Sequence, residues 1–166
     1  MKILAVMVRT IDIEVEVMRR FNVRRNVIVP NVSWGITDDH GIPLHECDVL
    51  ILNERGYATE VEIKTSMSDL KKDMEKRHGH SHSLIKFLYF AIPRDMYERG
   101  AEDYIPEKAG IIVVWEDMYG TIFSKEVRKA RQRKFFKKWD DNLRMQLYRL
   151  GMMRLYGLKV ALRSYL

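Results

Sequence analysis

The residues between positions 45 and 64, HECDVLILNERGYATEVEIK, combine an apolar hairpin pattern with several charged side chains. Asp48, Glu60 and Glu62 carry carboxylates, and Lys64 follows the last of them at a spacing of two. Carboxylates that face one another across two strands are destabilising unless something positive lies between them. One or two carboxylates that act together with substrate phosphates are typical ligands of Mg²⁺. These residue types therefore indicate a hard-cation site, with Mg²⁺ as the expected metal.

The geometry of the hairpin predicts which of these side chains meet. A three-residue loop of Glu54, Arg55 and Gly56, with the glycine in the left-handed conformation, places Asp48 opposite Glu62. Alternation along the strands then separates a core face from a second face. The core set is Cys47, Val49, Ile51, Thr59, Val61 and Ile63, and the second set is Asp48, Leu50, Leu52, Ala58, Glu60, Glu62 and Lys64. The second face is thus apolar near the turn and ionic at its far end.

A simpler interpretation is a solvated strand surface. A glutamate two residues before a lysine is a common pattern, and carboxylates interleaved with lysines usually face water. Two features oppose this interpretation. The ionic residues share a face with apolar ones, and three acids outnumber the one lysine. The cation site is therefore the hypothesis that we develop.

The elements that must position these residues follow from the periodicity of the sequence. Residues 10–21 fit a strand by alternation and a helix by their three-and-four spacing, and a capping signal at Thr10 or Asp12 favours the helix. A first strand, NVIVPNVSW, is expected to break at Pro30, and the two arms of the hairpin follow. The later segments are a helix, SMSDLKKDMEK, with a serine N-cap, and three strands, KFLYFAIP, AGIIVVWED and GTIFSKE. This order predicts an α/β fold with a mixed central sheet flanked by helices.

Length and composition bound the class of protein. The chain has 166 residues, of which 46% are hydrophobic and 31% are charged, which suits one globular core. Cys47 is the only cysteine, so no intramolecular disulfide can form, and a reducing cytoplasm is expected. The apolar run ILAVMV is too short and wrongly flanked for a signal peptide, and longer runs fall far below the roughly 20 residues that span a bilayer. A soluble, cytoplasmic protein is expected.

The charge of the chain is concentrated near its C-terminus. Residues 124–166 hold 13 Lys and Arg against 3 Asp and Glu, whereas residues 1–123 hold 16 against 20. Such an asymmetry indicates a polyanionic partner, most often nucleic acid and less often an anionic membrane surface.

Asp48 and the triplet Glu62-Ile63-Lys64 resemble the motif of the PD-(D/E)xK nuclease superfamily, in the expected order and on consecutive strands. Cys47 departs from the proline that the motif nominally has at this position. The predicted order of helix, three strands, helix and strand also fits the restriction-endonuclease-like core of that superfamily. The segments EVEIKTSMSDLKKD, KFLYFAIP and PEKAGIIVV are similar to small DNA-repair endonucleases of the mitomycin-response type. The resemblance is expected to cover residues 10–123 and to leave out the basic tail.

The resemblance implies a role for each motif residue. Asp48 and Glu62 would bind Mg²⁺, or Mn²⁺ in its place, with the backbone carbonyl of Ile63 as a further ligand. Lys64 would position or activate the attacking water. The implied reaction is phosphodiester hydrolysis, in which a metal lowers the pKa of water and neutralises charge on the phosphoryl oxygens. A lysine offers a compact positive charge near the nucleophile.

Nucleases of this kind usually have a further acid on the first helix, where Glu14 and Glu16 are the candidates. Glu14 shares a helical face with Val17, which must pack inward, whereas Glu16 shares one with Arg19 and is expected to face solvent. We therefore predict Glu14 as the fourth catalytic residue. Glu60 could act as an acid behind the metal ligands.

Other residues suggest chemistry more weakly. The run HGHSH offers three histidines at alternate positions, and a zinc site can be drawn from it together with residues nearer the hairpin. The residues concerned are His78, His80, His82, His40, His45 and Cys47. None of them has the spacing of a zinc finger, so a polar loop, with phosphate contact as a modest role, is the preferred interpretation. Trp34 could stack on a base or pack within a turn.

Residues 124–166 are predicted to form a basic amphipathic helical tail behind a nuclease-like domain of residues 1–123. Its apolar residues recur at helical spacing, which predicts packing on the domain or on a second copy in a homodimer; they are Phe136, Trp139, Leu143, Leu147 and Leu150. Its basic residues are predicted to bind nucleic acid, and they are Arg128, Lys129, Arg131, Arg133, Lys134, Lys137 and Lys138. DNA is preferred over a membrane because the chain also has a candidate phosphodiesterase site.

The sequence thus predicts a metal-dependent DNA endonuclease that acts on branched or damaged DNA in repair or recombination. The alternative is a non-catalytic nucleic-acid-binding module with a vestigial nuclease site. A third possibility is a basic scaffold that contacts membranes or partner helices.

Overall fold

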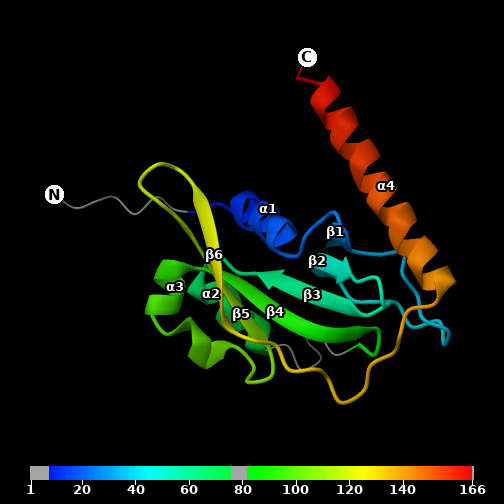
Figure 1. The fold of residues 1–166 in the computed structure, drawn as a ribbon, viewed down its shortest axis with the longest axis horizontal. Helices are drawn as coiled ribbons and strands as arrows, with labels where there is room; N and C mark the ends of the chain where they lie inside the picture. The colour runs from blue at the N-terminus through cyan, green and yellow to red at the C-terminus, as the bar shows by residue number, and fades with distance from the viewer. Residues whose placement is uncertain (1–7, 76–81, 166) are drawn as a thin grey trace.

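The structure is a computed structural model that describes residues 8–75 and 82–165. Six strands form one mixed sheet in which the strands lie side by side in chain order (Figure 1). The strands are β1 (Val27–Val32), β2 (Cys47–Leu52), β3 (Ala58–Ile63), β4 (Ile85–Pro93), β5 (Gly110–Glu116) and β6 (Ile122–Arg128). The helices are α1 (Thr10–Arg20), α2 (Met67–Glu75), α3 (Arg94–Glu98) and α4 (Asp141–Arg163), with a 3₁₀ turn at Ala101–Tyr104. The predicted α/β class and mixed sheet are confirmed.

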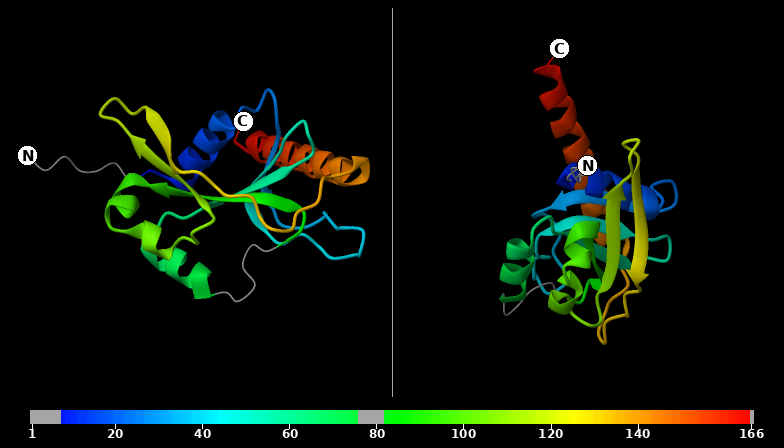
Figure 2. Two further views of the ribbon diagram at one scale, coloured as in Figure 1. Left: turned by 60° about the horizontal axis from the view of Figure 1, so that its bottom comes forward. Right: turned by 90° about the vertical axis from the view of Figure 1, so that its left-hand side faces the viewer.

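Helices cover both faces of the sheet. Strands β3, β4 and β5 run parallel, and the other neighbours pair antiparallel. Helix α1 packs Ile13 and Val17 against one face, while α2 and α3 lie on the other, where Leu70 and Met96 are buried (Figure 2). The two crossover connections of the parallel strands run through α2 and through α3. This arrangement is consistent with a restriction-endonuclease-like fold.

The hairpin has the predicted register. Val49 pairs with Val61 and Leu50 pairs with Glu60, as the three-residue loop requires. Gly56 has a φ of +83°, and a Cβ there would lie 2.6 Å from the Arg144 guanidinium. The left-handed backbone therefore favours glycine in this turn, and the Trp139 carbonyl, 3.1 Å from such a Cβ, leaves little room for a side chain.

The second face of the hairpin divides as predicted into an apolar and an ionic part. Leu50 belongs to an apolar cluster near the turn, and Phe90, which pairs with Glu62, belongs to another under α2 and α3. Glu60 and Glu62 lie between these clusters and are both buried. The face predicted for Cys47 is wrong, because Cys47 joins the cluster of Leu50. Cys47 pairs with Val32 of β1, and Asn31 beside that pair has a φ of +53°, which interrupts the regular alternation of this strand pair.

Two local predictions need correction. Residues 10–20 are helical, but the N-cap is Arg9, whose backbone N–H donates to the Asp12 carboxylate at 3.1 Å. Strand β1 does not break at Pro30, which pairs with Val49. As the first strand in the order, β1 lies at the edge of the sheet, where the missing N–H of proline is tolerated. The predicted serine cap of α2 is confirmed, because Ser66 Oγ accepts the Asp69 N–H at 3.2 Å.

The tail is helical over a shorter range than predicted. Residues 124–128 belong to β6, and residues 129–140 form an irregular segment before α4 begins. Four of the five predicted apolar residues, Trp139, Leu143, Leu147 and Leu150, are buried in one cluster with β1 and β2. Phe136 instead meets Tyr57 edge-to-face at 5.7 Å between ring centroids. Among the described residues, no helix has the length and apolar character needed to cross a membrane.

Candidate active site

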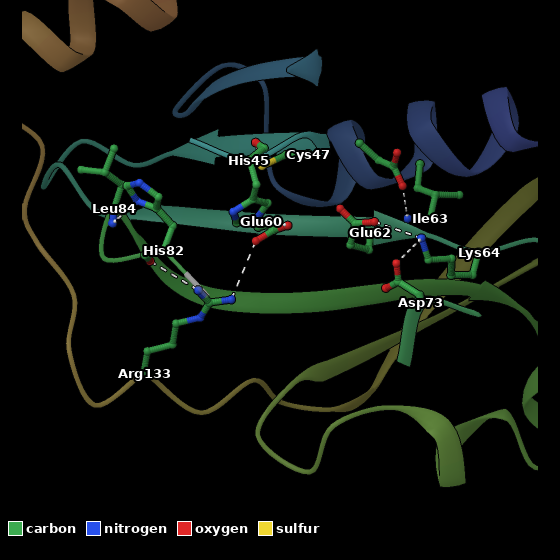
Figure 3. A network of polar contacts seen from close by, with 11 residues as sticks. His45, Cys47, Glu60, Glu62, Ile63, Lys64, Asp73, His82, Leu84 and Arg133 are labelled. Carbon is green, nitrogen blue, oxygen red and sulfur yellow. Dashed lines mark hydrogen bonds and ion pairs between the residues drawn. The ribbon is translucent and has the colours of Figure 1, made fainter. Parts of the chain in front are cut away.

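Lys64 lies at the end of β3 between two buried carboxylates (Figure 3). Its Nζ is 3.1 Å from Glu62 Oε2 and 3.6 Å from Asp73 Oδ1, and its side chain is 14% exposed. Its backbone N–H donates to the Ala91 carbonyl at 3.1 Å, which continues the pairing with β4. Burial alone would lower the pKa of Lys64, but the charges of Glu62, Asp73 and Asp48 raise it above its ordinary value. Lys64 is therefore held as a cation.

Asp48 holds the end of β3 through its side chain. Its Oδ2 accepts the backbone N–H of Ile63 at 2.7 Å, at the first rung beyond the paired residues Val49 and Val61. A carboxylate thus satisfies a strand N–H where the backbone ladder stops. The hydrogen bond places Asp48 against the strand segment that carries Glu62 and Lys64.

The structure does not decide between Glu14 and Glu16 as the catalytic acid of α1, because Glu14 is only half-buried and Glu16 is buried. Glu14 is half-buried and accepts a hydrogen bond from Asn31 Nδ2 at 3.3 Å. Burial raises the pKa of Glu14, the Asn31 hydrogen bond opposes this, and the nearby charge of Asp48 adds to the increase. Glu14 therefore faces the neighbourhood of Asp48, although its catalytic role remains a prediction.

Glu16 does not face solvent as predicted. It is buried and binds Arg19 through two contacts of 2.6 Å, and Ser124 Oγ donates to it at 2.6 Å. Strand β6 lies beside α1 and covers the face that the helical pattern alone left open. Burial raises the pKa of Glu16, but the hydrogen bonds from Arg19 and Ser124 have the larger combined effect in the opposite direction. The pKa of Glu16 is therefore below its ordinary value. Glu16 thus ties α1 to β6.

Asp73 was not predicted from the sequence. It is buried on α2, one helical turn from the fully buried Leu70, and lies 3.6 Å from the Lys64 ammonium. The spacing of three from a core leucine was the signal that could have found it, because such a position faces inward. An inward carboxylate on α2 thus gives the Lys64 ammonium a second anionic neighbour besides Glu62.

A second polar cluster lies along β3 from Lys64 (Figure 3). Glu60 is fully buried, with His45 Nε2 at 2.7 Å from its Oε1 and an Arg133 nitrogen at 3.8 Å from its Oε2. The donor atoms of His45, Cys47 and Glu60 all lie within 4.8 Å of one another, a grouping that could hold a metal ion. Burial, with the nearby carboxylates, raises the pKa of the Cys47 thiol. Glu60 thus has a hydrogen-bond partner in His45 and an ion-pair partner in Arg133.

His82 approaches this cluster without joining it as a ligand. Its ring centroid is 6.4 Å from that of His45, and its Nδ1 accepts the Leu84 backbone N–H at 3.2 Å. With Nδ1 accepting this bond, the neutral ring carries its proton on Nε2, and His82 is not part of the group formed by His45, Cys47 and Glu60. His78 and His80 lie outside the described residues, and His40 is exposed. Of the zinc site drawn from the sequence, the structure brings together His45 and Cys47.

The predicted nucleic-acid-binding residues divide into three groups. Arg128 donates to the carbonyls of Ile105, Pro106 and Ala109, and Arg133 pairs with Glu60, so both contact the body of the protein. Arg131 and Lys137 form surface ion pairs, with Glu107 and Asp39 respectively. The side chains of Lys129, Lys134 and Lys138 are exposed. DNA contact stays a prediction for all seven residues.

The donor chemistry near Lys64 suits a hard cation. Asp48 and Glu62 offer carboxylate oxygens, and Ile63, whose N–H binds Asp48, offers a backbone carbonyl. Mg²⁺ needs only one or two protein carboxylates and prefers oxygen ligands. The residues present therefore fit the metal that the resemblance implies.

A profile of one protein family, described as DNA repair protein MmcB-like, matches residues 22–161. The chain belongs to the MmcB-like family. None of the curated proteins compared with it matches the chain. Among solved structures, a protein of unknown function from Silicibacter pomeroyi, SPO1766, matches with a TM-score of 0.54 and 18% identity, over 91% of this chain and 88% of that one. At this identity the likeness shows the fold alone.

The MmcB-like match differs at both ends from the extent expected of the resemblance. It begins after α1, so it leaves out Glu14 and Glu16, and it includes the hairpin, Lys64 and Asp73. It continues to residue 161, through most of α4. The basic tail, expected to lie outside the resemblance, is therefore part of the MmcB-like region.

Proposed function

We propose that this MmcB-like protein is a metal-dependent DNA endonuclease that hydrolyses phosphodiester bonds. One observation carries the proposal: at the end of β3, Asp48 accepts the Ile63 N–H at 2.7 Å and Lys64 lies 3.1 Å from Glu62. These are the three residues that resemble the PD-(D/E)xK motif. Membership of a DNA repair family supports DNA as the substrate, and branched or damaged DNA is the class that a repair role suggests.

The proposed metal ligands are Asp48, Glu62 and the carbonyl of Ile63. When bound there, Mg²⁺ or Mn²⁺ supplies positive charge to the phosphoryl oxygens and lowers the pKa of a water. Lys64 keeps its proton beside Glu62, so its ammonium positions the attacking water and does not remove its proton. Asp73 holds the other side of the Lys64 ammonium and fixes its direction. Glu14 adds a carboxylate on the α1 side, near Asp48.

The alternative function is a DNA-binding module without catalysis. The observation that favours it is the neutralisation of Lys64 by two carboxylates at 3.1 and 3.6 Å, which is also how a purely structural ion pair is built. In that case Glu62 and Lys64 would contribute to folding and not to cleavage.

Nuclease assays with matched variants separate the two functions. Supercoiled, linear and branched DNA are incubated with the protein and Mg²⁺, Mn²⁺ or EDTA. Glu62→Gln and Lys64→Ala should each lower cleavage by about 100-fold or more, with DNA binding in EDTA largely retained. Glu54→Gln, in the exposed turn, and Lys72→Ala, exposed on α2, make the same chemical changes away from the site and should leave cleavage unchanged.

Full activity in either Glu62→Gln or Lys64→Ala would overturn the assignment. Both variants are needed because a contaminating nuclease would survive each of them. Binding without cleavage of any of the three DNA forms by the wild-type protein would favour the non-catalytic module.

A further inference from the structure

The polar cluster around Glu60 brings a nitrogen, a sulfur and an oxygen donor together. Its members are His45, which precedes β2, Cys47, the first residue of β2, and Glu60 in β3. One ligand atom of each residue lies within 4.8 Å of the ligand atoms of the other two. Cys47 and Glu60 are fully buried, and the His45 side chain is 27% exposed. We call these three residues the β2–β3 cluster.

The positions of the three residues in the fold explain why they meet. His45 and Cys47 are two residues apart, a spacing that places both side chains on one side of an extended chain. Glu60 belongs to the neighbouring strand, where it pairs with Leu50. Cys47 shares a buried cluster with Leu50, so it faces the same side of the sheet as Glu60. In Figure 3, His45 and Cys47 approach Glu60 from one side and Arg133 approaches it from the other.

The donor types select the kind of metal. Mg²⁺ takes oxygen ligands, whereas a thiolate and an imidazole together suit Zn²⁺ and related transition metals. Three protein ligands, with a water in the fourth position, are a regular arrangement around Zn²⁺. The β2–β3 cluster therefore matches Zn²⁺ and differs in chemistry from the oxygen donors near Lys64.

The distances fit Zn²⁺ after a small adjustment. With bonds of about 2.0 to 2.3 Å, two ligand atoms of a tetrahedral Zn²⁺ ion lie about 3.3 to 3.6 Å apart. His45 Nε2 and Glu60 Oε1 are 2.7 Å apart and share a hydrogen bond, which the ion replaces as the two atoms separate. The Cys47 sulfur, at most 4.8 Å from either atom, approaches by about 1 Å. His45 lies outside the strands and is partly exposed, so it has the freedom to make this adjustment.

The two oxygens of Glu60 have different surroundings. Oε1 faces His45, whereas Oε2 lies 3.8 Å from an Arg133 nitrogen. One oxygen is thus placed for the metal while the other keeps its guanidinium partner, which is how bound carboxylates are commonly held. Zn²⁺ binding releases the thiol proton of Cys47 to the solvent. The thiolate and the Glu60 carboxylate then balance the two positive charges of the ion.

We propose that the β2–β3 cluster binds one Zn²⁺ ion that joins the start of β2 to β3. Glu60 is two residues from Glu62, which corresponds to roughly 7 Å along a strand, whereas the ions of a two-metal catalytic site are about 4 Å apart. The Zn²⁺ ion therefore has a structural role and no part in the proposed cleavage. Because Cys47 directly precedes Asp48, the ion also fixes the backbone beside a proposed Mg²⁺ ligand.

Titration with Co²⁺ tests the site, because Co²⁺ takes the place of Zn²⁺ and absorbs light when a thiolate binds it. Untagged protein is stripped of metal with EDTA and transferred to buffer with excess Mg²⁺. It should bind one equivalent of Co²⁺ with a thiolate-to-cobalt charge-transfer band, and added Zn²⁺ should abolish the band. Cys47 is the only cysteine, so the band reports this residue alone.

His45→Gln is the decisive variant, because glutamine keeps a hydrogen-bond donor for Glu60 but lacks the imidazole. It should raise the Co²⁺ dissociation constant about 100-fold or more. His40→Gln is the matched control, since His40 is exposed in the same connection between β1 and β2, and it should bind as the wild type does. Urea unfolding in EDTA shows that each variant is folded before metal is added. Zn²⁺ should also raise the melting temperature of the wild type and of His40→Gln, but not that of His45→Gln.

Two results would overturn the site. Absence of the band in folded wild-type protein would leave the β2–β3 cluster as a hydrogen-bond network around the buried Glu60. A band with wild-type affinity in His45→Gln would mean that Cys47 holds an adventitious ion only. Equal Zn²⁺ shifts of the melting temperature in the wild type and His45→Gln would contradict the structural role of the ion. None of these measurements uses DNA, so the result does not depend on nuclease activity.

Discussion

Lys64 shows how one residue's surroundings limit its chemistry. Burial favours the neutral amine, yet Glu62 and Asp73 lie close enough to keep the ammonium charged and to raise the pKa of Lys64. While Glu62 and Asp73 are ionised, the ion pairs therefore contribute stability below the ordinary pKa of lysine, near 10.4, and this contribution is lost as the pH rises through the higher folded pKa of Lys64. A lysine of this kind donates hydrogen bonds and orients anions across the neutral range. It is unsuited to act as a general base there.

Asp48 has two separable properties, its charge and its hydrogen bond to Ile63. Asp48→Asn keeps an oxygen for the Ile63 N–H and removes a negative charge near Glu14, so without metal it should melt at or above the wild-type temperature. Asp48→Ala leaves that N–H without its acceptor and should lose about 1–3 kcal/mol. Saturating Mg²⁺ should raise the wild-type melting temperature by preferential binding to the folded state and should raise that of Asp48→Asn far less.

Thermal melts of the three proteins in EDTA and in Mg²⁺ provide the measurement. Glu54→Gln, which removes a charge from the exposed turn, shows the effect of charge alone. Equal Mg²⁺ shifts in the wild type and Asp48→Asn would contradict a role for Asp48 as a metal ligand. Its position would then be explained by the hydrogen bond to Ile63.

At the scale of elements, the sequence predicted correctly the features that depend on residues close together in the chain. The hairpin register followed from the turn and the alternation, because Gly56 fixes the loop and both strand faces are buried. The environment of Glu16 could not be predicted, since it depends on β6, more than a hundred residues away in the chain. Cys47 pairs with Val32 next to Asn31, whose φ of +53° interrupts the alternation, so the hairpin pattern did not predict the face of Cys47. Sequence reasoning about the candidate site was thus strongest inside the hairpin.

The start of α4 shows the same limit. The helix predicted for residues 124–166 begins only at Asp141. Trp139, one of the apolar residues of the predicted helical pattern, is buried but lies before the helix. Its indole N–H donates to the Leu84 carbonyl at 2.7 Å, and its backbone N–H donates to the Gly56 carbonyl at 2.8 Å. Trp139 thereby joins the tail to the hairpin turn and to the start of β4. Its role depends on contacts with distant strands, which periodicity does not report.

Trp139→Ala should therefore destabilise the whole body of the protein. Loss of a large buried ring costs about 3–5 kcal/mol in typical cores. The measurement is equilibrium urea unfolding followed by far-ultraviolet circular dichroism, which does not depend on the removed indole. Phe135→Ala is the matched control, because Phe135 is 77% exposed on the same segment, and it should change the stability by less than about 0.5 kcal/mol. A cost below about 1 kcal/mol for Trp139→Ala would mean that the tail folds independently of the hairpin.

At the scale of the whole molecule, not every basic residue of the tail is available to bind DNA. Arg128 is bound by three backbone carbonyls, and Arg133 neutralises the buried Glu60. Burial lowers the pKa of both guanidinium groups, and neither side chain is fully exposed. Both arginines thus bind groups of the protein itself. The cations available to a polyanion on this segment are therefore chiefly exposed lysines, which lie along the surface between β6 and α4.

DNA binding should depend on these lysines through its response to salt. Changing Lys129, Lys134 and Lys138 together to Gln should weaken binding to duplex DNA. It should also flatten the plot of log affinity against log salt by about 0.9 for each phosphate that the variant no longer neutralises. Fluorescence anisotropy in EDTA over a series of salt concentrations measures the slope without cleavage. Arg99→Gln, an exposed change at the residue after α3 that also removes one positive charge, should leave the slope unaltered.

The arginines give the complementary result in the same experiment. Arg133→Gln leaves Glu60 buried beside His45 without its guanidinium partner, so it should lower the melting temperature while leaving the salt slope close to that of the wild type. If the triple lysine variant kept the full slope, the exposed lysines would not bind phosphates, and the tail would serve packing and assembly alone. If Arg133→Gln flattened the slope at unchanged stability, Arg133 would bind DNA directly. Measuring both the salt slope of DNA binding and the melting temperature on the same variants therefore distinguishes basic residues that stabilise the fold from those that bind DNA.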